Sequence, residues 1–349
     1  MSVMWDLPDF DGHEAVHFFH DVETGLSAII ALHSTHLGPG AGGTRFWHYE
    51  SRETAVTDAL RLSRGMSFKN AMAGLPLGGG KAVILADRKR TKSPEMLAAF
   101  GQMIDSLGGR YITAEDVGIS TADMVEVSKQ TQFVSGLPVS DQGHAGGDPG
   151  PFTAMGVYLG VKAAVRHKLG RDSMEDIHVA IQGVGSVGGG LARLLAKDGA
   201  RLSIADINKE HAAKLAGEIG ANVVGLDDVM RLEADVFSPN ALGAILDKVS
   251  IAHLNVPIVA GGANNQLATP EDGQRIFDRN ILFAPDYVIN SGGIINVGLE
   301  YLGDSNVDEV NQRIAKIPAR LTEIWEESAS SKLPSAEVAD NMAQALIGR

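Results

Sequence analysis

The stretch Ile177-His-Val-Ala-Ile-Gln-Gly-Val-Gly-Ser-Val-Gly188 decides the fold, because an apolar strand leads at once into glycines spaced G-x-G-x-x-G and a helical pattern. A second strand, Arg201-Leu-Ser-Ile-Ala-Asp206, ends in an acid 23 residues after Gly183. In a dinucleotide-binding unit such glycines let a pyrophosphate approach the amides that start the helix. Glycines that only permit tight packing are the alternative interpretation, which this complete context disfavours.

The acid that ends the second strand indicates which dinucleotide is bound. A carboxylate at Asp206 accepts hydrogen bonds from ribose hydroxyls and repels a 2′-phosphate, so NAD is favoured over NADP. A surface acid without a ligand is the alternative. Strand-length apolar runs then alternate with helical or loop segments, at 177–182, 201–206, 222–224, 234–238, 257–260 and 281–283. This alternation predicts a parallel, doubly wound α/β sheet.

Composition excludes several classes of function. The net charge of −13 and the pI near 5.3 disfavour nucleic acid as a partner. The absence of cysteine excludes disulfides, thiol catalysis and thiolate metal sites. The six histidines between 13 and 48 lack the spacing and acid partner of a zinc site, so we expect no metal. Without a signal-peptide pattern or an apolar run of ~18 residues, a cytoplasmic protein with no membrane partner is expected.

A second unusual stretch, the lysine stretch, is Gly65-Met-Ser-Phe-Lys-Asn-Ala-Met-Ala-Gly-Leu-Pro-Leu-Gly-Gly-Gly-Lys81. Its glycines and proline predict a tight loop between Lys69 and Lys81, and two cations there suggest an anion site. A triphosphate-binding loop is excluded, because Leu75 and Ala82 replace its first glycine and its hydroxyl residue. A lysine desolvated beside a second cation would have a lowered pKa, as a general base needs. Solvated lysines on a simple turn are the alternative.

The rest of the sequence predicts further secondary-structure elements and a domain boundary. A hairpin at 16–20 and 26–33 is followed by residues 37–46, which are too rich in glycine for a regular element. The Gly- and Pro-rich segment 136–151 predicts a domain boundary or an active-site loop that acts as a hinge. Helices are expected at 51–66, 93–107, 121–131, 152–168, 186–198, 208–219, 308–329 and 336–347, and further strands at 82–86 and 111–117.

Several motifs occur together in one order: Leu-Pro-Leu-Gly-Gly-Gly-Lys81, Thr-Ala-Glu-Asp116-Val-Gly, the glycine fingerprint, Phe-Ser-Pro-Asn-Ala-Leu-Gly243, Gly-Ala-Asn-Asn-Gln-Leu267 and Asp-Tyr-Val-Ile-Asn-Ser-Gly-Gly-Ile-Ile-Asn296. With them the chain resembles the glutamate/leucine/phenylalanine/valine dehydrogenase superfamily, in particular its branch for apolar amino acids. The resemblance implies two domains with the active site in the cleft between them. We expect a substrate and oligomerisation domain at 1–145, an NAD-binding Rossmann domain at 146–330 and a C-terminal helix at 331–349 that packs back on the first domain.

The resemblance also implies an activity, the reversible NAD-dependent oxidative deamination of an L-amino acid by a homo-oligomer. Lys69 would bind the substrate carboxylate, Lys81 would activate water, and Asp116 would exchange a proton with the amino group. The other substrate contacts would be Asn264, Ala41, Gly42, Met66, Ala114, Ile294 and Val297. The cofactor contacts would be Thr153, Gly183, Gly185, Ser186, Val187, Gly188, Asp206, Ser238, Asn240, Ala241 and Asn264. Asn240 stands where many relatives have cysteine, which leaves its role open.

The side-chain pocket implied by the resemblance excludes glutamate. Glutamate-specific members carry lysine at the position of Ala41 and a hydroxyl residue at that of Val297, and an unpaired distal carboxylate would be costly to bury. Branched-chain substrates, leucine or valine, rank first. Because Ala41 is smaller than the leucine common in leucine-type enzymes, phenylalanine or tryptophan is the alternative.

Two other classes of protein stay open at this point. A dinucleotide-binding sensor without catalysis would have no need for Lys69, Lys81 and Asp116 together. A 2-hydroxy-acid dehydrogenase would use a histidine base with an arginine for the carboxylate, and no such constellation is found in the sequence.

Overall fold

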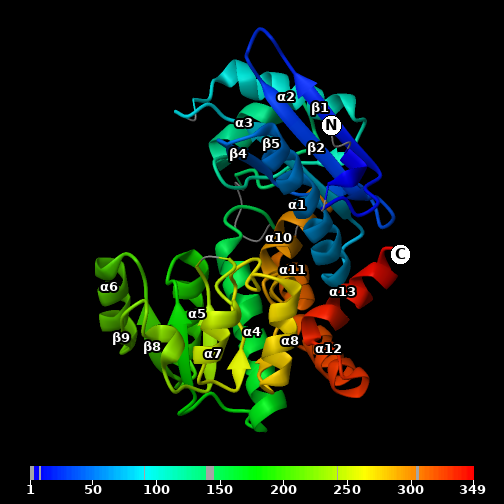
Figure 1. The fold of residues 1–349 in the computed structure, drawn as a ribbon. Helices are drawn as coiled ribbons and strands as arrows, with labels where there is room; N and C mark the ends of the chain where they lie inside the picture. The colour runs from blue at the N-terminus through cyan, green and yellow to red at the C-terminus, as the bar shows by residue number, and fades with distance from the viewer. Residues whose placement is uncertain (1–3, 8, 90, 139–144, 242, 304–305) are drawn as a thin grey trace. The chain divides into compact units, whose positions relative to one another are not determined.

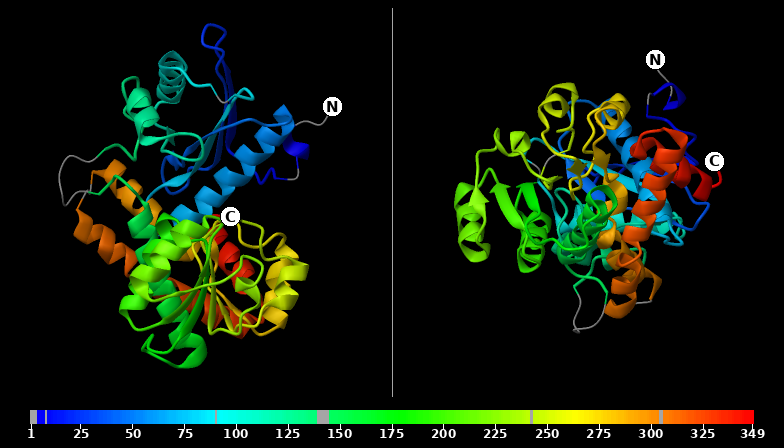
Figure 2. Two further views of the ribbon diagram at one scale, coloured as in Figure 1. Left: turned by 90° about the vertical axis from the view of Figure 1, so that its left-hand side faces the viewer. Right: turned by 90° about the horizontal axis from the view of Figure 1, so that it is seen from below.

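The computed structural model describes residues 4–7, 9–89, 91–138, 145–241, 243–303 and 306–349, and contacts divide the chain into two compact units (Figures 1 and 2). Unit 1 comprises Met1–Asp148, Ile294–Val310 and Ala343–Arg349, and unit 2 comprises Pro149–Gly293 and Asn311–Met342. The predicted α/β class with two domains is confirmed. The ranges 1–145, 146–330 and 331–349 stay predictions as domain boundaries.

Unit 1 begins with a short 3-10 helix, η1 (Met4–Asp6), and a mixed sheet follows. The predicted hairpin is confirmed, since β1 (Ala15–His20) and β2 (Ser27–Ser34) pair antiparallel. Strand order is β1-β2-β5-β3-β6, with β4 also paired to β5. The remaining strands are β3 (Gly40–Ala41), β4 (Thr44–Trp47), β5 (Gly78–Leu85) and β6 (Tyr111–Ile112).

Two predictions for this unit were wrong, and both concern glycine. Residues 37–46, expected to be irregular, contain the parallel strands β3 and β4. The lysine stretch is not a tight loop between two lysines, because α1 (Arg52–Met72) carries Lys69 in its last turn and β5 carries Lys81. The cause is close packing. A Cβ built on Gly79 would lie 2.1 Å from the Ser67 hydroxyl of α1, so only glycine lets the helix approach this strand.

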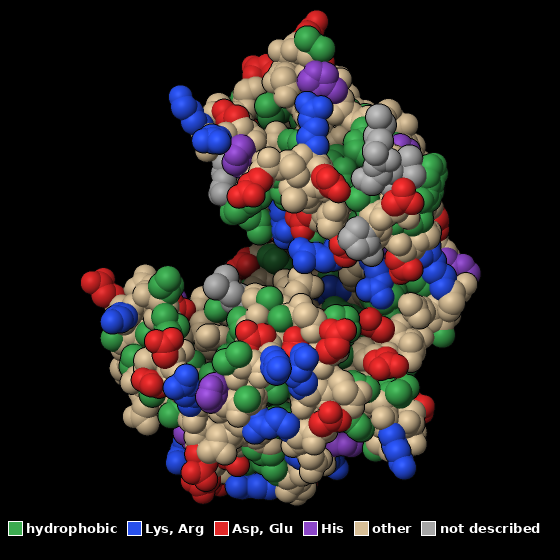
Figure 3. Space-filling view, in the orientation of Figure 1, with side chains coloured by type: hydrophobic (Ala, Val, Ile, Leu, Met, Phe, Trp, Pro, Cys, Tyr) green, Lys and Arg blue, Asp and Glu red, His purple; other side chains and the backbone are tan. Residues whose placement is uncertain are grey.

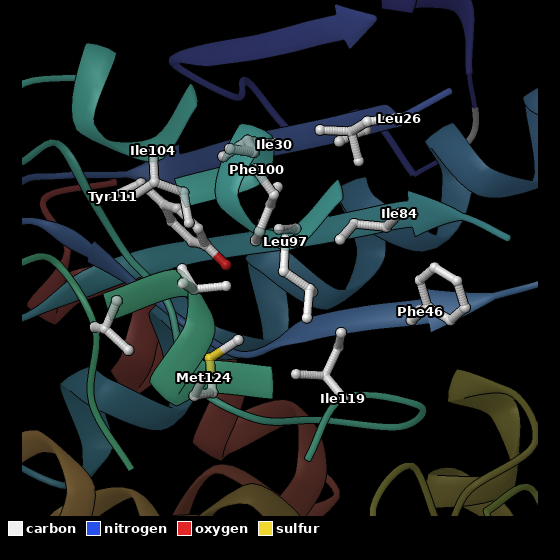
Figure 4. Packing of buried hydrophobic residues seen from close by; sticks show 14 of the residues in the cluster. Leu26, Ile30, Phe46, Ile84, Leu97, Phe100, Ile104, Tyr111, Ile119 and Met124 are labelled. Carbon is white, nitrogen blue, oxygen red and sulfur yellow. The ribbon is translucent and has the colours of Figure 1, made fainter. Parts of the chain in front are cut away.

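One face of the unit 1 sheet is covered by α2 (Pro94–Ser106) and α3 (Thr121–Ser128) through a large apolar core (Figure 4). Leu97, Phe100 and Ile104 of α2 pack against Ile30 and Ile84 of the strands in this cluster. Both helices start at serines that cap their first turn, Ser93 and Ser120. The other face packs on α1, where Ala55, Ala59 and Leu60 meet Ile29, Ala31 and Val83.

Unit 2 is a parallel sheet of six strands in the order β12-β11-β10-β7-β8-β9, with helices on both sides (Figure 2). This is the strand order 3-2-1-4-5-6 of a dinucleotide-binding fold, and it reverses between β7 and β10. The strands are β7 (His178–Gln182), β8 (Arg201–Ala205), β9 (Asn222–Val223), β10 (Val236–Pro239), β11 (Ile258–Val259) and β12 (Leu282–Phe283). The helices are α4 (Gly150–Leu169), α5 (Ser186–Lys197), α6 (Lys209–Ile219), η2 (Val229–Arg231), α7 (Lys248–His253), α8 (Pro270–Asp278) and α9 (Asp286–Ile289).

The C-terminal part is helical: α10 (Gly292–Leu302), α11 (Val307–Ile314), α12 (Ile317–Ser331) and α13 (Ser335–Leu346). The single helix expected at 308–329 is wrong, since it is divided into α11 and α12 with Pro318 in the first turn of α12. The end of the chain, Ala343–Arg349, belongs to unit 1.

The distribution of charged and apolar side chains in the folded chain is consistent with the composition of the sequence. On the face shown in Figure 3, Lys and Arg side chains are interspersed with Asp and Glu. Within the described part of the chain, no helix combines the length and apolarity that crossing a membrane requires.

Candidate active site

The centre of the candidate site in unit 1 is an ion pair between Lys81 and Asp116. Lys81 lies on β5 with a side chain only 7% exposed, and its Nζ donates to Asp116 Oδ2 at 2.7 Å. Asp116 follows β6, which is regular over two residues only, so the strand expected at 111–117 is shorter than predicted. The sequence expectation placed a second cation beside Lys81, whereas the charged group in contact with it is this carboxylate.

The Asp116 carboxylate also receives a second cation, Arg45 of β4, whose Nε lies 3.3 Å from the same Oδ2 atom. Burial raises the pKa of Asp116, but the charges of Lys81 and Arg45 outweigh it and hold the pKa below its usual value. The ionised carboxylate is therefore the form that the folded chain stabilises. A carboxylate next to a buried lysine can exchange protons and stabilise positive charge on a bound group.

Lys69 is half-buried in the last turn of α1, three residues after Met66. A Cβ on Gly42 would lie 2.0 Å from the carbonyl oxygen of Gly80 and 2.9 Å from Cγ of Met66. Gly42 therefore joins the helix that carries Lys69 to the strand that carries Lys81. Helix, strand and glycine bring these predicted residues into one region of unit 1.

Ala41 belongs to a small apolar cluster. It is 5% exposed and clusters with Leu75, Leu77 and Ile112, against which Ile294 and Tyr301 also pack. Val297 is buried and Ala114 is half-buried. Leu75 and Leu77 flank Pro76 in the lysine stretch, where no pattern predicted a role for them in the pocket.

The predicted glycine fingerprint forms the turn between β7 and α5, which we call the glycine turn (residues 183–188). Gly183 has a φ of +84°, and a Cβ on Gly188 would lie 2.0 Å from the Gly183 carbonyl oxygen. Gly185 is the N-cap of α5, has no side-chain cap and meets nothing within 4 Å. The first amides of an α-helix have no partner within it, so those of Ser186 and Val187 could receive an anionic ligand.

Asp206 follows the last residue of β8, next to the glycine turn. Its Oδ2 accepts from the Val184 amide at 2.8 Å and its Oδ1 from the Asn208 amide at 2.8 Å. The acid therefore holds the glycine turn, and it is half-buried. Carboxylate oxygens accept more than one hydrogen bond each, so ribose hydroxyls could still bind there.

Asn240 stands where β10 ends, beside the end of β7 at the reversal of strand order. Its amide donates to the Ser238 carbonyl at 2.9 Å and hydroxyl at 3.0 Å, and its Oδ1 accepts from the Gly262 amide at 2.8 Å. Asn240 therefore ties together the segments that follow β10 and β11. Ser238 is fully buried beneath it, while the neighbouring Ala241 is exposed.

The two remaining predicted residues also lie in unit 2. Asn264 is exposed, and its Oδ1 accepts from the Asn290 side chain at 2.7 Å. Thr153 lies in the first turn of α4 and donates to the Pro149 carbonyl at 2.9 Å. Both stay predictions as ligand contacts.

Comparison with known proteins identifies the family. The model for the Glu/Leu/Phe/Val dehydrogenase dimerisation domain matches residues 13–133, and that for Glutamate/Leucine/Phenylalanine/Valine dehydrogenase matches residues 202–346. Leucine dehydrogenase of Geobacillus stearothermophilus is 46% identical over 95% of this chain and 90% of its own. The chain belongs to the glutamate/leucine/phenylalanine/valine dehydrogenase family.

Further relatives in the family differ in their substrates. Valine dehydrogenase of Streptomyces albus is 43% identical over 96% of this chain and 92% of its own. The crystal structure of L-tryptophan dehydrogenase from Nostoc punctiforme matches with a TM-score of 0.86 at 38% identity, over 96% of each chain. Membership of this dehydrogenase family implies a nicotinamide dinucleotide cofactor, and the open glycine turn with its uncapped helix fits one.

Three polar residues of the site region had no role in the sequence analysis: Arg45, Asn296 and Glu300. Asn296 of α10 accepts from the Gly146 amide and donates to its carbonyl, both at 2.9 Å. Glu300 accepts from the amides of Gly136 and Leu137 at 2.8 and 3.1 Å. Helix α10 thus holds the chain on both sides of residues 139–144, the part of the predicted hinge at 136–151 that lies outside the described residues. Asn296 closes a quoted motif, which is the signal that could have found it.

Proposed function

We propose that this family member catalyses the reversible, NAD-dependent oxidative deamination of an apolar L-amino acid, with leucine or valine preferred. The products are the 2-oxo acid, ammonia and NADH. The observation that carries the proposal is the buried Lys81–Asp116 pair in a chain that is 46% identical to a leucine dehydrogenase.

The proposed roles in unit 1 follow from charge and burial. Lys69 binds the α-carboxylate common to all amino acids, because a cation at the end of α1 offsets that charge. Asp116 takes a proton from the substrate ammonium, so that the amine can lose hydride from its α-carbon. Lys81 takes a proton from the water that attacks the resulting iminium carbon, which gives a carbinolamine. Asp116 then returns its proton to the carbinolamine nitrogen, and ammonia leaves as the carbinolamine hydroxyl loses its proton to solvent.

The proposed cofactor is NAD, bound on the glycine turn through Ser186, Val187 and the three glycines. The nicotinamide supplies the hydride acceptor when bound. Asp206 would accept from the ribose hydroxyls and repel the 2′-phosphate of NADP. Thr153, Asn240, Ala241 and Asn264 are proposed to complete the cofactor site, with Ser238 supporting Asn240 from below.

The proposed substrate pocket is apolar, with walls from Ala41, Ala114, Ile294 and Val297. Nothing in that set pairs a distal carboxylate, which disfavours glutamate. The second candidate is an aromatic substrate, favoured by the small side chain of Ala41 and by the similarity to a tryptophan dehydrogenase. Association of copies through the domain matched as a dimerisation domain, and a cytoplasmic location, are further parts of the proposal.

The test is NADH formation at alkaline pH by purified protein with leucine, valine, isoleucine, phenylalanine, tryptophan and glutamate, with NADP as the control cofactor. Highest kcat/KM for leucine or valine with NAD supports the proposal. Highest kcat/KM for phenylalanine or tryptophan supports the second candidate. No turnover alongside intact NAD binding would make a sensor the better account.

A further inference from the structure

A chain of charged groups leads away from the Lys81–Asp116 pair to the buried acid Asp58 of α1. The Asp58 side chain is 11% exposed and accepts three hydrogen bonds, from Arg45 Nη1 at 2.9 Å, Arg61 Nη2 at 3.0 Å and Tyr49 OH at 2.6 Å. Only Arg45 among these three also contacts Asp116. Arg45 therefore joins a structural acid on α1 to the acid of the candidate active site.

The sheet register explains why Arg45 reaches both acids. On the parallel strands β4 and β5, Arg45 is the partner of Val83, which lies two residues after Lys81. Since side chains alternate along a strand, Arg45, Val83 and Lys81 project from the same face. That face packs on α1, where Val83 meets the apolar cluster of the helix and Asp58 faces Arg45.

The charges around Arg45 favour its ionised form. Burial lowers the pKa of the Arg45 guanidinium, but Asp116 and Asp58 outweigh it and raise the pKa above its usual value. Arg45 is only 23% exposed, so its charge is poorly screened by solvent. Asp58 fixes one end of the guanidinium and leaves Nε directed at Asp116.

We propose that Arg45, anchored by Asp58, is a positioning residue that holds the Asp116 carboxylate against Lys81 for the proton exchange of the reaction. The inference rests on the proposed function. The hydrogen bonds from Lys81 and Arg45 both end on Oδ2 of Asp116. Oδ1 is thus the oxygen presented to the substrate amino group, and Arg45 sets its direction without touching the substrate.

The experiment compares the full-length enzyme with Arg45→Met, Arg45→Lys and Asp58→Asn, and uses Arg61→Met as the matched control. Arg61 is 57% exposed and contacts Asp58 but not Asp116, so Arg61→Met should keep wild-type kcat. Arg45→Met should lower kcat for leucine oxidation by about 10- to 100-fold. Its KM for leucine should stay within about threefold, because Lys69 and not Arg45 binds the carboxylate in the proposed function. Arg45→Lys should have a higher kcat than Arg45→Met, because lysine keeps the positive charge. It should not reach the wild-type kcat, because lysine cannot contact Asp58 and Asp116 at two points as arginine does.

The pH profile adds a readout that lost packing would not move. The groups that face Asp116 are Lys81 from β5, Arg45 from β4 and the buried phenol of Tyr111 from β6, whose pKa is raised by burial. Removing Arg45 takes a cation from the carboxylate and raises the pKa of Asp116. The acid limb of the pH profile of kcat/KM should therefore move to higher pH in Arg45→Met. In Asp58→Asn it should also move to higher pH, but by a smaller amount.

Two results overturn the inference. One is Arg45→Met with kcat and pH profile within about twofold of wild type. If Arg45→Met is unfolded at room temperature, the deciding variant is Asp58→Asn. A folded Asp58→Asn with the kcat and pH profile of the wild type would then overturn the inference. A wild-type protein that turns over no amino acid contradicts the proposed function instead, so the two failures are distinguishable.

Discussion

The glycines around Lys81 in unit 1 and Gly185 in unit 2 have opposite roles. In unit 1, Gly42, Gly79 and Gly80 lie where backbones touch, and an added Cβ would meet protein atoms at 2.0, 2.1 and 2.7 Å. In unit 2, Gly185 meets nothing within 4 Å and precedes a helix without a side-chain cap. The first set lets the protein pack against itself around Lys81, while Gly185 leaves space for a ligand. The surroundings of the missing side chain thus distinguish glycines that allow close packing around Lys81 from a glycine that is open to a ligand.

The largest effect should come from Lys81, the residue that the close-packed glycines bury. Lys81→Ala removes the proposed base and should lower kcat by about 10³-fold or more, as expected for loss of a general base. Binding of NADH, measured by its fluorescence, should stay at the wild-type level because the glycine turn is untouched. Lys129→Ala is the control, since Lys129 is a surface lysine 58% exposed. Wild-type turnover by Lys81→Ala would remove the central residue of the account.

A matched pair of glycine substitutions tests the comparison itself. Gly79→Ala places a methyl group 2.2 Å from the Ser67 amide nitrogen and should lower the free energy of unfolding by about 3 kcal/mol. Gly185→Ala should change it by less than about 0.5 kcal/mol but weaken NAD binding about tenfold, because the methyl group occupies the space of the pyrophosphate. Denaturant melts and NAD titrations of both variants decide this. Equal stability of the two variants would show that the contrast between the glycines is wrong.

Cofactor choice should depend on the charge of Asp206. Asp206→Asn keeps an acceptor for the Val184 amide but removes the repulsion of a 2′-phosphate. The ratio of kcat/KM for NAD to that for NADP should fall by about tenfold, with a melting temperature near wild type. An unchanged ratio would mean that Asp206 only holds the glycine turn.

Ala41→Leu should change the substrate preference of the pocket by a similar factor. The larger side chain fills space in the cluster with Leu75, Leu77 and Ile112. The kcat/KM ratio of leucine to phenylalanine should rise about tenfold, since differences of one or two methylenes in a pocket have effects of this size. A ratio that stays constant would place the aromatic side chain elsewhere.

The smallest effect concerns acid stability in unit 1. His33 is fully buried, and burial, with the charge of Arg349, lowers its pKa from 6.5 to about 4. The unfolded chain therefore binds more protons than the folded one between these values, so stability falls as pH drops from about 6.5 toward about 4. His33→Gln should weaken this dependence, measured by denaturant melts at several pH values. An identical slope would assign it to other groups, such as His13, whose pKa burial also lowers.

The sequence predicted unit 2 far better than unit 1, for a local reason. Each strand of unit 2 is followed by its own helix. The periodicity of apolar residues and the spacing of the glycines along the chain therefore reveal β7, the glycine turn and α5. The strand at Gly78 and the strands β3 and β4 depend on α1 and on strands distant in sequence. A run of glycines has no periodicity of its own, and therefore it appeared to be a loop.

The candidate active site shows the same limit of local sequence patterns. Lys69, Lys81 and Asp116 were proposed as site residues because their motifs resemble a known family. The contact of Lys81 with Asp116, which is 35 residues away in the sequence, could not be derived from the spacing of the lysine stretch. Arg45 lies within the quoted Ala-Gly-Gly-Thr-Arg-Phe segment, yet its contacts with Asp58 and Asp116 require the register of β4 on β5.

The most direct test of the central claim is the reverse reaction, measured as NADH oxidation with 4-methyl-2-oxopentanoate, the 2-oxo acid of leucine. The account predicts that oxidation requires ammonium and yields leucine, because nitrogen must bind the carbon between Lys81 and Asp116 before hydride arrives. Oxidation at the same rate without ammonium would indicate a 2-hydroxy-acid dehydrogenase and contradict the account.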